Sequence, residues 1–302
     1  MIVPFAHVGG GVFEPLQLVP PLVALTAYAV RARTLARQGR PVPMARAASF
    51  ALGIALVIAG LTTPVAHIGG ELVLAHMAQH LAMADLGALF LVLGLTGPIL
   101  QPLLATRLAR KLRVLAHPVV AFVLWVIDLY VWHLPALYEA SLSSAPVHAL
   151  QHTTFVFFGV TMWLALLGPL PQPEWFGNGA KLLYIVGVRL AGALLANVFI
   201  WSETVFYPAY RPGQASWQIS PLEDQGTAGT IMMLEGSIVT VVLLGWLFLK
   251  TAREAEERQA LVELASARGV ELSDRRAARA VAAGRGEELR RRLDRSAADI
   301  PG

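Results

Sequence analysis

Residues 73–97 read VLAHMAQHLAMADLGALFLVLGLTG, and this stretch decides the fold class. Apart from two histidines, Asp85 is the only ionisable side chain in it. A helix needs about 20 consecutive apolar residues to cross the hydrocarbon core of a bilayer. The stretch therefore predicts a transmembrane helix, and the pentapeptide His76-Met77-Ala78-Gln79-His80 lies at its start.

The rest of the chain has the same apolar character. Hydrophobic residues make up 56% of the sequence, charged residues 15%, and the mean hydropathy is +0.58. These values are typical of a protein that crosses the lipid bilayer several times, so the sequence pI of about 9.7 does not indicate a nucleic-acid partner. We predict an all-α bundle of seven transmembrane helices, at 14–30, 47–66, 73–97, 118–137, 148–168, 180–202 and 225–249.

Basic residues predict the orientation of these helices, because cationic loops stay on the cytoplasmic side. The loops after the first and third predicted spans are rich in arginine and contain no acidic residue. We therefore expect the N-terminus outside and the C-terminus in the cytoplasm. The predicted domains are a transmembrane domain at 1–250 and a charged cytoplasmic tail at 251–302, helical and solvated, with breaks near Gly269 and Gly284.

Two copies of one histidine motif stand out against this background. His76 and His80 form the first pair, and His148 and His152, in His-Ala-Leu-Gln-His, form the second. Residues four apart share one face of a helix, so each copy presents two imidazoles side by side. The predicted topology places both pairs, and His133, at the extracytoplasmic ends of their spans. The sequence thus predicts a metal site built from the two pairs, with His133 nearby.

Further groups could assist such a site. In a regular α-helix Met83 lies one turn below His80 on nearly the same face. Ionisable residues inside a membrane face the bundle or a cavity, so candidates also include Asp85, Asp128, Asp224 and Glu235. Imidazole and thioether ligands suit copper, as Cu(I) or Cu(II), and the chain has no cysteine that could provide a thiolate instead. Met232 and Met233 are close to Glu235 in sequence.

Each of these residues also has a purely structural interpretation. A single histidine at the membrane interface is more often a hydrogen-bonding anchor than a ligand, and methionine commonly fills gaps in a core. The carboxylates of Asp85 and Asp128 could bond to other helices, with Arg189 as their counter-ion. Gln79 and Gln151 could orient the imidazoles or only join helices.

Several motifs resemble the CtaG-type cytochrome c oxidase assembly factors of bacteria, over roughly residues 14–250. The resemblance rests on both histidine motifs, Trp132-His133-Leu134-Pro135, Tyr207-Pro208-Ala209-Tyr210 and Asp224-Gln225-Gly226-Thr227-Ala228-Gly229. It implies a seven-span protein of the bacterial plasma membrane that delivers copper to a maturing haem–copper oxidase. The partners implied are the oxidase subunits and other copper chaperones.

The hypothesis that follows is a non-enzymatic copper chaperone that passes its ion on by ligand exchange. A second interpretation is a copper importer that uses Met83, Asp85, Asp128 and Glu235 as stations within the membrane. A third is a haem-binding electron carrier in which histidines from two facing helices bind the iron.

Overall fold

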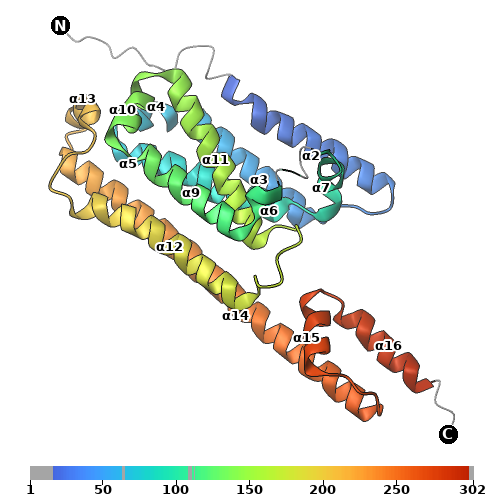
Figure 1. Cartoon of the computed structure of the whole chain (residues 1–302). Coiled ribbons are helices and arrows are strands. Elements are labelled where there is room, and N and C mark those ends of the chain that lie inside the picture. The colour runs from blue at the N-terminus through green and yellow to red at the C-terminus, as the bar shows by residue number, and fades with distance from the viewer. Residues whose placement is uncertain (1–15, 63–64, 108–110, 112, 299–302) are drawn as a thin grey trace. The chain divides into compact units, whose positions relative to one another are not determined.

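The computed structural model describes residues 16–62, 65–107, 111 and 113–298. The described residues form helices joined by short loops, with no β-strand among them (Figure 1). They fall into two compact units, one ending at Ile238 and the other beginning at Val239. Each unit is described by itself. The all-α class predicted from the apolar runs is confirmed.

The first unit is a bundle built around one central helical rod. This rod is α5 (Val73–His80), η1 (Leu81–Gly87) and α6 (Ala88–Gly94), and it packs against α3 and α11, while α11 packs against α9. The other elements of this unit are α2 (Val19–Arg37), α3 (Met44–Leu61), α4 (Val65–Gly69), α7 (Gly97–Leu104), η2 (Arg113–Ala116), α9 (Pro118–Trp132), α10 (Pro135–Ser143), α11 (Ala145–Leu167), α12 (Asn178–Trp201), η3 (Pro208–Tyr210), α13 (Arg211–Ser216) and the first part of α14 (Pro221–Ala267).

Five helices of the described residues are long and apolar enough to cross a membrane, or six if α9 and α10 count as one bent span. The five are α3, the α5–η1–α6 rod, α11, α12 and α14. This is the architecture of a multi-pass membrane protein. The predicted first span, 14–30, falls partly on α2, which runs on to Arg37 and includes Arg31 and Arg33, so it is less apolar. Seven spans and the orientation of the termini stay predictions.

The predicted fourth span, 118–137, is not one straight helix. It breaks after Trp132, and α10 leaves α9 at an angle of 72°. The cause lies in the sequence, because Pro135 lacks an amide hydrogen and forces Leu134 into an extended conformation, with ψ of 129°. The Trp-His-Leu-Pro motif is therefore a corner, and it places His133 at the bend.

The third span also departs from a regular helix. Residues Leu81–Gly87 form a π-helix, which inserts an extra residue per turn directly after His80. The 100° periodicity that placed Met83 below the histidine pair does not apply across this segment. Residues after His80 are consequently rotated relative to the α-helical expectation.

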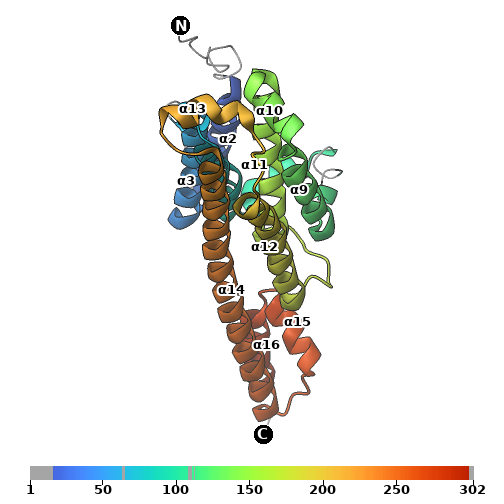
Figure 2. The ribbon, with the colours of Figure 1, turned by 90° about the vertical axis from the view of Figure 1, so that its left-hand side faces the viewer.

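Close packing of helices in the first unit depends on small residues. At Gly159 of α11, a Cβ atom would collide with the backbone carbonyl of Ala84 in η1. At Gly229 of α14, a Cβ atom would lie 2.6 Å from the Ala196 carbonyl of α12. Figure 2 shows α12 and α14 side by side along this contact. In a membrane, where burial of apolar surface does not drive helices together, such close approach is a main source of association.

The second unit contains the end of α14, α15 (Asp274–Ala282) and α16 (Gly286–Ala298). The helices end close to Gly269 and Gly284, both of which adopt positive φ. The three helices share a small apolar core formed by Leu261, Ala265, Ala277, Val281 and Leu293. The tail is thus a helical bundle with its own core, whereas a set of solvated helices was expected.

Candidate metal site

The two histidine pairs face each other across the contact between α5 and α11. One ring nitrogen from each of His76, His80 and His148 lies within 4.8 Å of the other two. We call these three residues the histidine trio. The ring of His152 is adjacent, with its centroid 4.1 Å from that of His148 and 5.2 Å from that of His80. Two identical motifs that are 72 positions apart therefore contribute to one cluster.

The cluster is largely buried, and each of its rings has a nitrogen without a hydrogen-bond partner among the described residues. His76 is 1% exposed, and His80 and His152 are also buried. The Nε2 atoms of all four residues lack a hydrogen-bond partner among the described residues. Buried polar atoms are normally paired, so a group of unpaired ones calls for a ligand that is not part of the chain. Imidazole nitrogens with free lone pairs are suited to a metal ion.

The other ring nitrogen of two of these histidines is held in place. His76 Nδ1 lies 3.2 Å from the carbonyl oxygen of Gly69, and His152 Nδ1 lies 3.0 Å from the amide oxygen of Gln17. An oxygen of this kind only accepts, so Nδ1 is the donor and a neutral ring keeps the lone pair on Nε2. This is the outer-shell arrangement that orients metal-binding imidazoles.

His133, at the corner between α9 and α10, lies outside the histidine trio. Its Nδ1 bonds to the carbonyl of Leu129, 2.6 Å away, and its ring packs near Phe155 and Phe199. Its Nε2 is likewise buried without a partner among the described residues. The structure therefore places His133 at the same end of the bundle with a nitrogen available, but in a separate position.

Asp224 contacts the backbone of the ligand-bearing helix, whereas the sequence suggested a contact with the metal. Its carboxylate accepts hydrogen bonds from the amides of Val73, at 2.8 Å, and Leu74, at 3.0 Å. The side chain of Gln214 donates a third bond, at 2.8 Å. Asp224 is 0% exposed. It thus caps α5 from a distant part of the chain and balances the positive end of that helix.

The other residues of the Asp-Gln-x-x-Ala-Gly motif also hold the start of α14 against neighbouring elements. Gln225 joins the loop before η3, because its amide accepts a bond from the Phe206 amide and donates one to the Thr204 carbonyl. Ala228 is fully buried and Gly229 allows the close contact with α12. The motif therefore fixes α14 against α5, α12 and the loop between α12 and α14.

A group of tyrosines adjoins the histidine trio, and the sequence offered no chemical argument for it. The ring of Tyr138 stacks on that of Tyr207 at 3.8 Å and lies 5.0 Å from that of His76. The hydroxyl of Tyr210 donates to the Gly69 carbonyl that also accepts from His76. The Tyr-Pro-Ala-Tyr motif, noted only for its resemblance, could have indicated this contact.

The hydroxyls of this group act as hydrogen-bond donors. Burial raises the pKa of both Tyr207 and Tyr210 well above the usual range of a phenol. They remain protonated, and Tyr207 donates to the carbonyl of His133 at 2.8 Å. The tyrosines thereby tie the loop between α12 and α14 to the corner at His133 and to α4.

Met83 and Asp128 have other contacts. The side chain of Met83 packs against Gly60 of α3, where Gln79 also donates a hydrogen bond to the backbone. Asp128 bonds with Thr154 and Trp132. Among the described residues, no Asp or Glu joins the three histidine nitrogens. The structure therefore brings the histidines together, and the assisting role of Met83 and Asp128 stays a prediction.

Asp85 and Glu235 form a second polar cluster, deeper along the rod. Their side chains share a hydrogen bond between η1 and α14, and Trp163 donates to Asp85 at 2.9 Å. Arg189 of α12 bonds to the sulfur of Met233 and to Ser237 and lies near Glu235. Met233 is thus a partner of Arg189, which is the counter-ion of this cluster and not of Asp128.

Comparison with known proteins places the chain in one family. The family model described as cytochrome c oxidase caa3 assembly factor (Caa3_CtaG) matches residues 26–254. Uncharacterized proteins of Mycobacterium bovis and Mycobacterium tuberculosis are each 23% identical over 261 residues, which is 80% of this chain. The chain spans 39% of the length of these curated relatives. No solved structure matches the chain.

Proposed function

The chain belongs to the family of cytochrome c oxidase caa3 assembly factors, and from this premise we propose that it binds copper at the histidine trio and delivers it to the oxidase. The observation that carries the proposal is the trio itself, three imidazoles from two helices with converging nitrogens. His152 and His133 provide further nitrogens at the same end of the first unit. The proposed location is the bacterial plasma membrane.

The chemistry of the donors favours copper. Imidazole binds copper and zinc well, and a site made only of nitrogens selects against calcium and magnesium, which prefer oxygen. Zinc would satisfy the same donors, and the family's role in the assembly of a cytochrome c oxidase supports copper as the proposed metal. No nucleophile or general base is needed for this role, and we propose no enzymatic activity.

Delivery requires that the ion can leave. Three histidines leave at least one coordination position of a tetrahedral ion open, and a ligand from a recipient can enter there. His152 lies next to both His148 and His80, so it can bind the ion when one histidine of the trio dissociates from it. This arrangement supports the proposal that the ion passes by stepwise ligand exchange to an oxidase subunit, and that it can be received from another copper chaperone in the same way.

The test is the copper content of the purified protein. We expect the variant His76→Ala/His148→Ala to lose about one equivalent of tightly bound copper, because each helix then offers too few ligands. The matched control is His67→Ala/His117→Ala, which removes two histidines outside the trio and should retain the copper. Equal copper binding by both variants would contradict the proposed site. An absorbance spectrum of the same preparation tests for haem.

A copper importer is the second candidate, and the Asp85–Glu235 cluster favours it. Buried carboxyl groups in a membrane protein commonly line ion paths. Asp85 of the rod and Glu235 of α14 meet deeper in the first unit than the histidines. Copper uptake into proteoliposomes distinguishes the two functions. Uptake that is lost in Asp85→Asn/Glu235→Gln, with copper binding retained, would establish transport; binding without uptake supports delivery at the outer end.

A further inference from the structure

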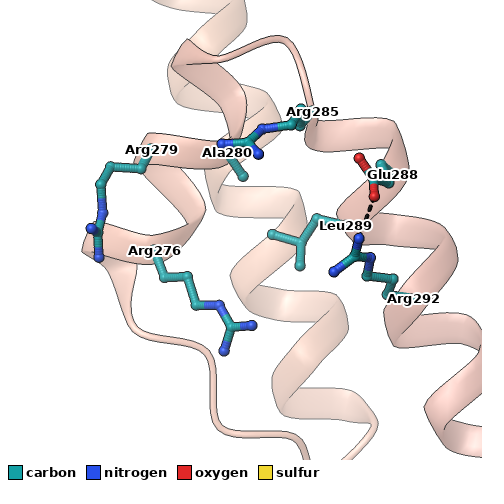
Figure 3. A pocket seen from close by; sticks show the side chains of 7 residues that line it. All are labelled: Arg276, Arg279, Ala280, Arg285, Glu288, Leu289 and Arg292. Carbon is teal, nitrogen blue, oxygen red and sulfur yellow. Dashed lines mark hydrogen bonds and ion pairs between the residues drawn. The ribbon is translucent and has the colours of Figure 1, made fainter.

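The second unit gathers basic side chains around a pocket, although its sequence has nearly balanced charge. The pocket has a volume of about 360 Å³ and is lined by Arg276, Arg279, Ala280, Arg285, Glu288, Leu289 and Arg292. Figure 3 shows the guanidinium groups of Arg276, Arg285 and Arg292 around Leu289. Four arginines and one glutamate leave a net positive charge in a space of this size.

Several acidic residues of the tail form ion pairs outside the pocket. Ion pairs outside the pocket join Asp274 to Arg258, Asp294 to Arg268 and Glu287 to Arg291. Glu288 pairs with Arg292 within it. Arg276, Arg279 and Arg285 have no carboxylate partner among the described residues, and the side chain of Arg279 donates to the Arg275 carbonyl.

The fold of the second unit brings these arginine side chains together. Arg276 and Arg279 lie three residues apart in α15, and Arg276 extends toward Leu289 while Arg279 extends to the other side (Figure 3). Arg285 is brought opposite them by the turn at Gly284, where φ is +66°, and by the bond from its own amide to the Ala280 carbonyl. The small core under Ala277 and Val281 holds α15 and α16 in this arrangement.

We propose that this pocket binds a phosphate-bearing ligand. Guanidinium groups present a planar fork of donors that matches phosphate oxygens, and several of them converging on one space favour a multiply charged or bidentate anion. Ala280 and Leu289 add an apolar wall that suits an organic phosphate better than a bare ion. The chemistry is the same for a soluble phosphate compound and for the headgroup of an anionic lipid.

The pocket lies close enough to the apolar part of α14 for the phosphate group to belong to a lipid headgroup. Gly286, next to Arg285, lies against Glu257. From Lys250, where the apolar part of α14 ends, to Glu257 the helix rises roughly 10 Å. A basic pocket at this height is within reach of the headgroups that surround an apolar helix.

The experiment uses the full chain in nanodiscs and follows amide hydrogen exchange in α15 and α16. One arm titrates inorganic pyrophosphate into protein in neutral phosphatidylcholine discs, and the other compares these discs with discs containing phosphatidylglycerol. Protection by pyrophosphate identifies a soluble ligand, and protection only by phosphatidylglycerol identifies a lipid. Either result supports the pocket if the variant Arg276→Gln/Arg279→Gln/Arg285→Gln weakens the effect by about tenfold or more.

The matched control is Arg275→Gln/Arg290→Gln/Arg295→Gln, which removes the same charge at positions of α15 and α16 outside the pocket. This control should retain the wild-type affinity for the phosphate-bearing ligand within about twofold. The single variant Arg285→Gln, which lies outside both helices and leaves their core intact, should weaken binding severalfold. The proposal is overturned if neither ligand protects the helices, or if the control triple variant loses as much affinity as the pocket variant.

Discussion

At the scale of single residues, the groups that offer lone pairs to a metal differ from the groups that hold the ligand-bearing helix in position. His76, His80 and His148 present buried nitrogens without partners. Asp224, which the sequence suggested as an assisting ligand, uses its carboxylate on the amides at the start of α5. A polar residue inside a membrane can therefore matter for a metal site without touching the ion.

We predict that Asp224→Ala lowers copper affinity through the position of α5. The change leaves two buried amides and Gln214 without their acceptor, which should cost roughly 2–4 kcal/mol of stability and reduce affinity by about tenfold. The measurements are thermal unfolding and competition with a copper chelator. X-ray absorption should show the same number of nitrogen ligands as in the wild type.

The control for this prediction is Glu223→Ala, which removes an exposed neighbouring carboxylate. It should change neither the thermal stability nor the copper affinity. If Asp224→Ala removed an oxygen ligand from the absorption spectrum of bound copper, Asp224 would be a ligand and the positioning role would be wrong.

At the scale of elements, irregular segments determine where the site lies. The π-helix after His80 and the corner at Pro135 both interrupt helices that the sequence pattern predicted as continuous. The corner follows from local chemistry, because the restrictions on proline and its preceding residue are known from the sequence. The π-helix does not, since it depends on how η1 packs between α3 and α11.

We predict that Gly159→Ala separates η1 from α11 and destabilises the protein. Its methyl group would collide with the Ala84 carbonyl oxygen, so one of the two helices must shift. The expected loss is about 1–3 kcal/mol in detergent unfolding. Gly192→Ala in α12 is the matched control, because a Cβ atom there meets nothing within 4 Å. It should be neutral or slightly stabilising. Equal stability of the two variants would contradict the proposed role of the close contact.

At the scale of the whole molecule, membrane topology is the largest open prediction, and the absence of cysteine in the sequence makes it testable. We expect Ser216→Cys, in α13, to react with an impermeant maleimide from outside the cell. Gln38→Cys, between α2 and α3, and Ala283→Cys, between α15 and α16, should react only after permeabilisation. Labelling of Ser216→Cys and Gln38→Cys from the same side would refute the predicted orientation.

The sequence by itself determined the helical class, the membrane character and the family, because these depend on apolar run length and on local motifs. It also identified all members of the histidine cluster, since their spacing of four residues is a local property of a helix. Which nitrogens converge, the capping role of Asp224, the tyrosine contacts and the arginine pocket were decided only by the tertiary structure. These features join residues that are distant in the chain, and their positions depend on how helices pack, which periodicity along one helix does not specify.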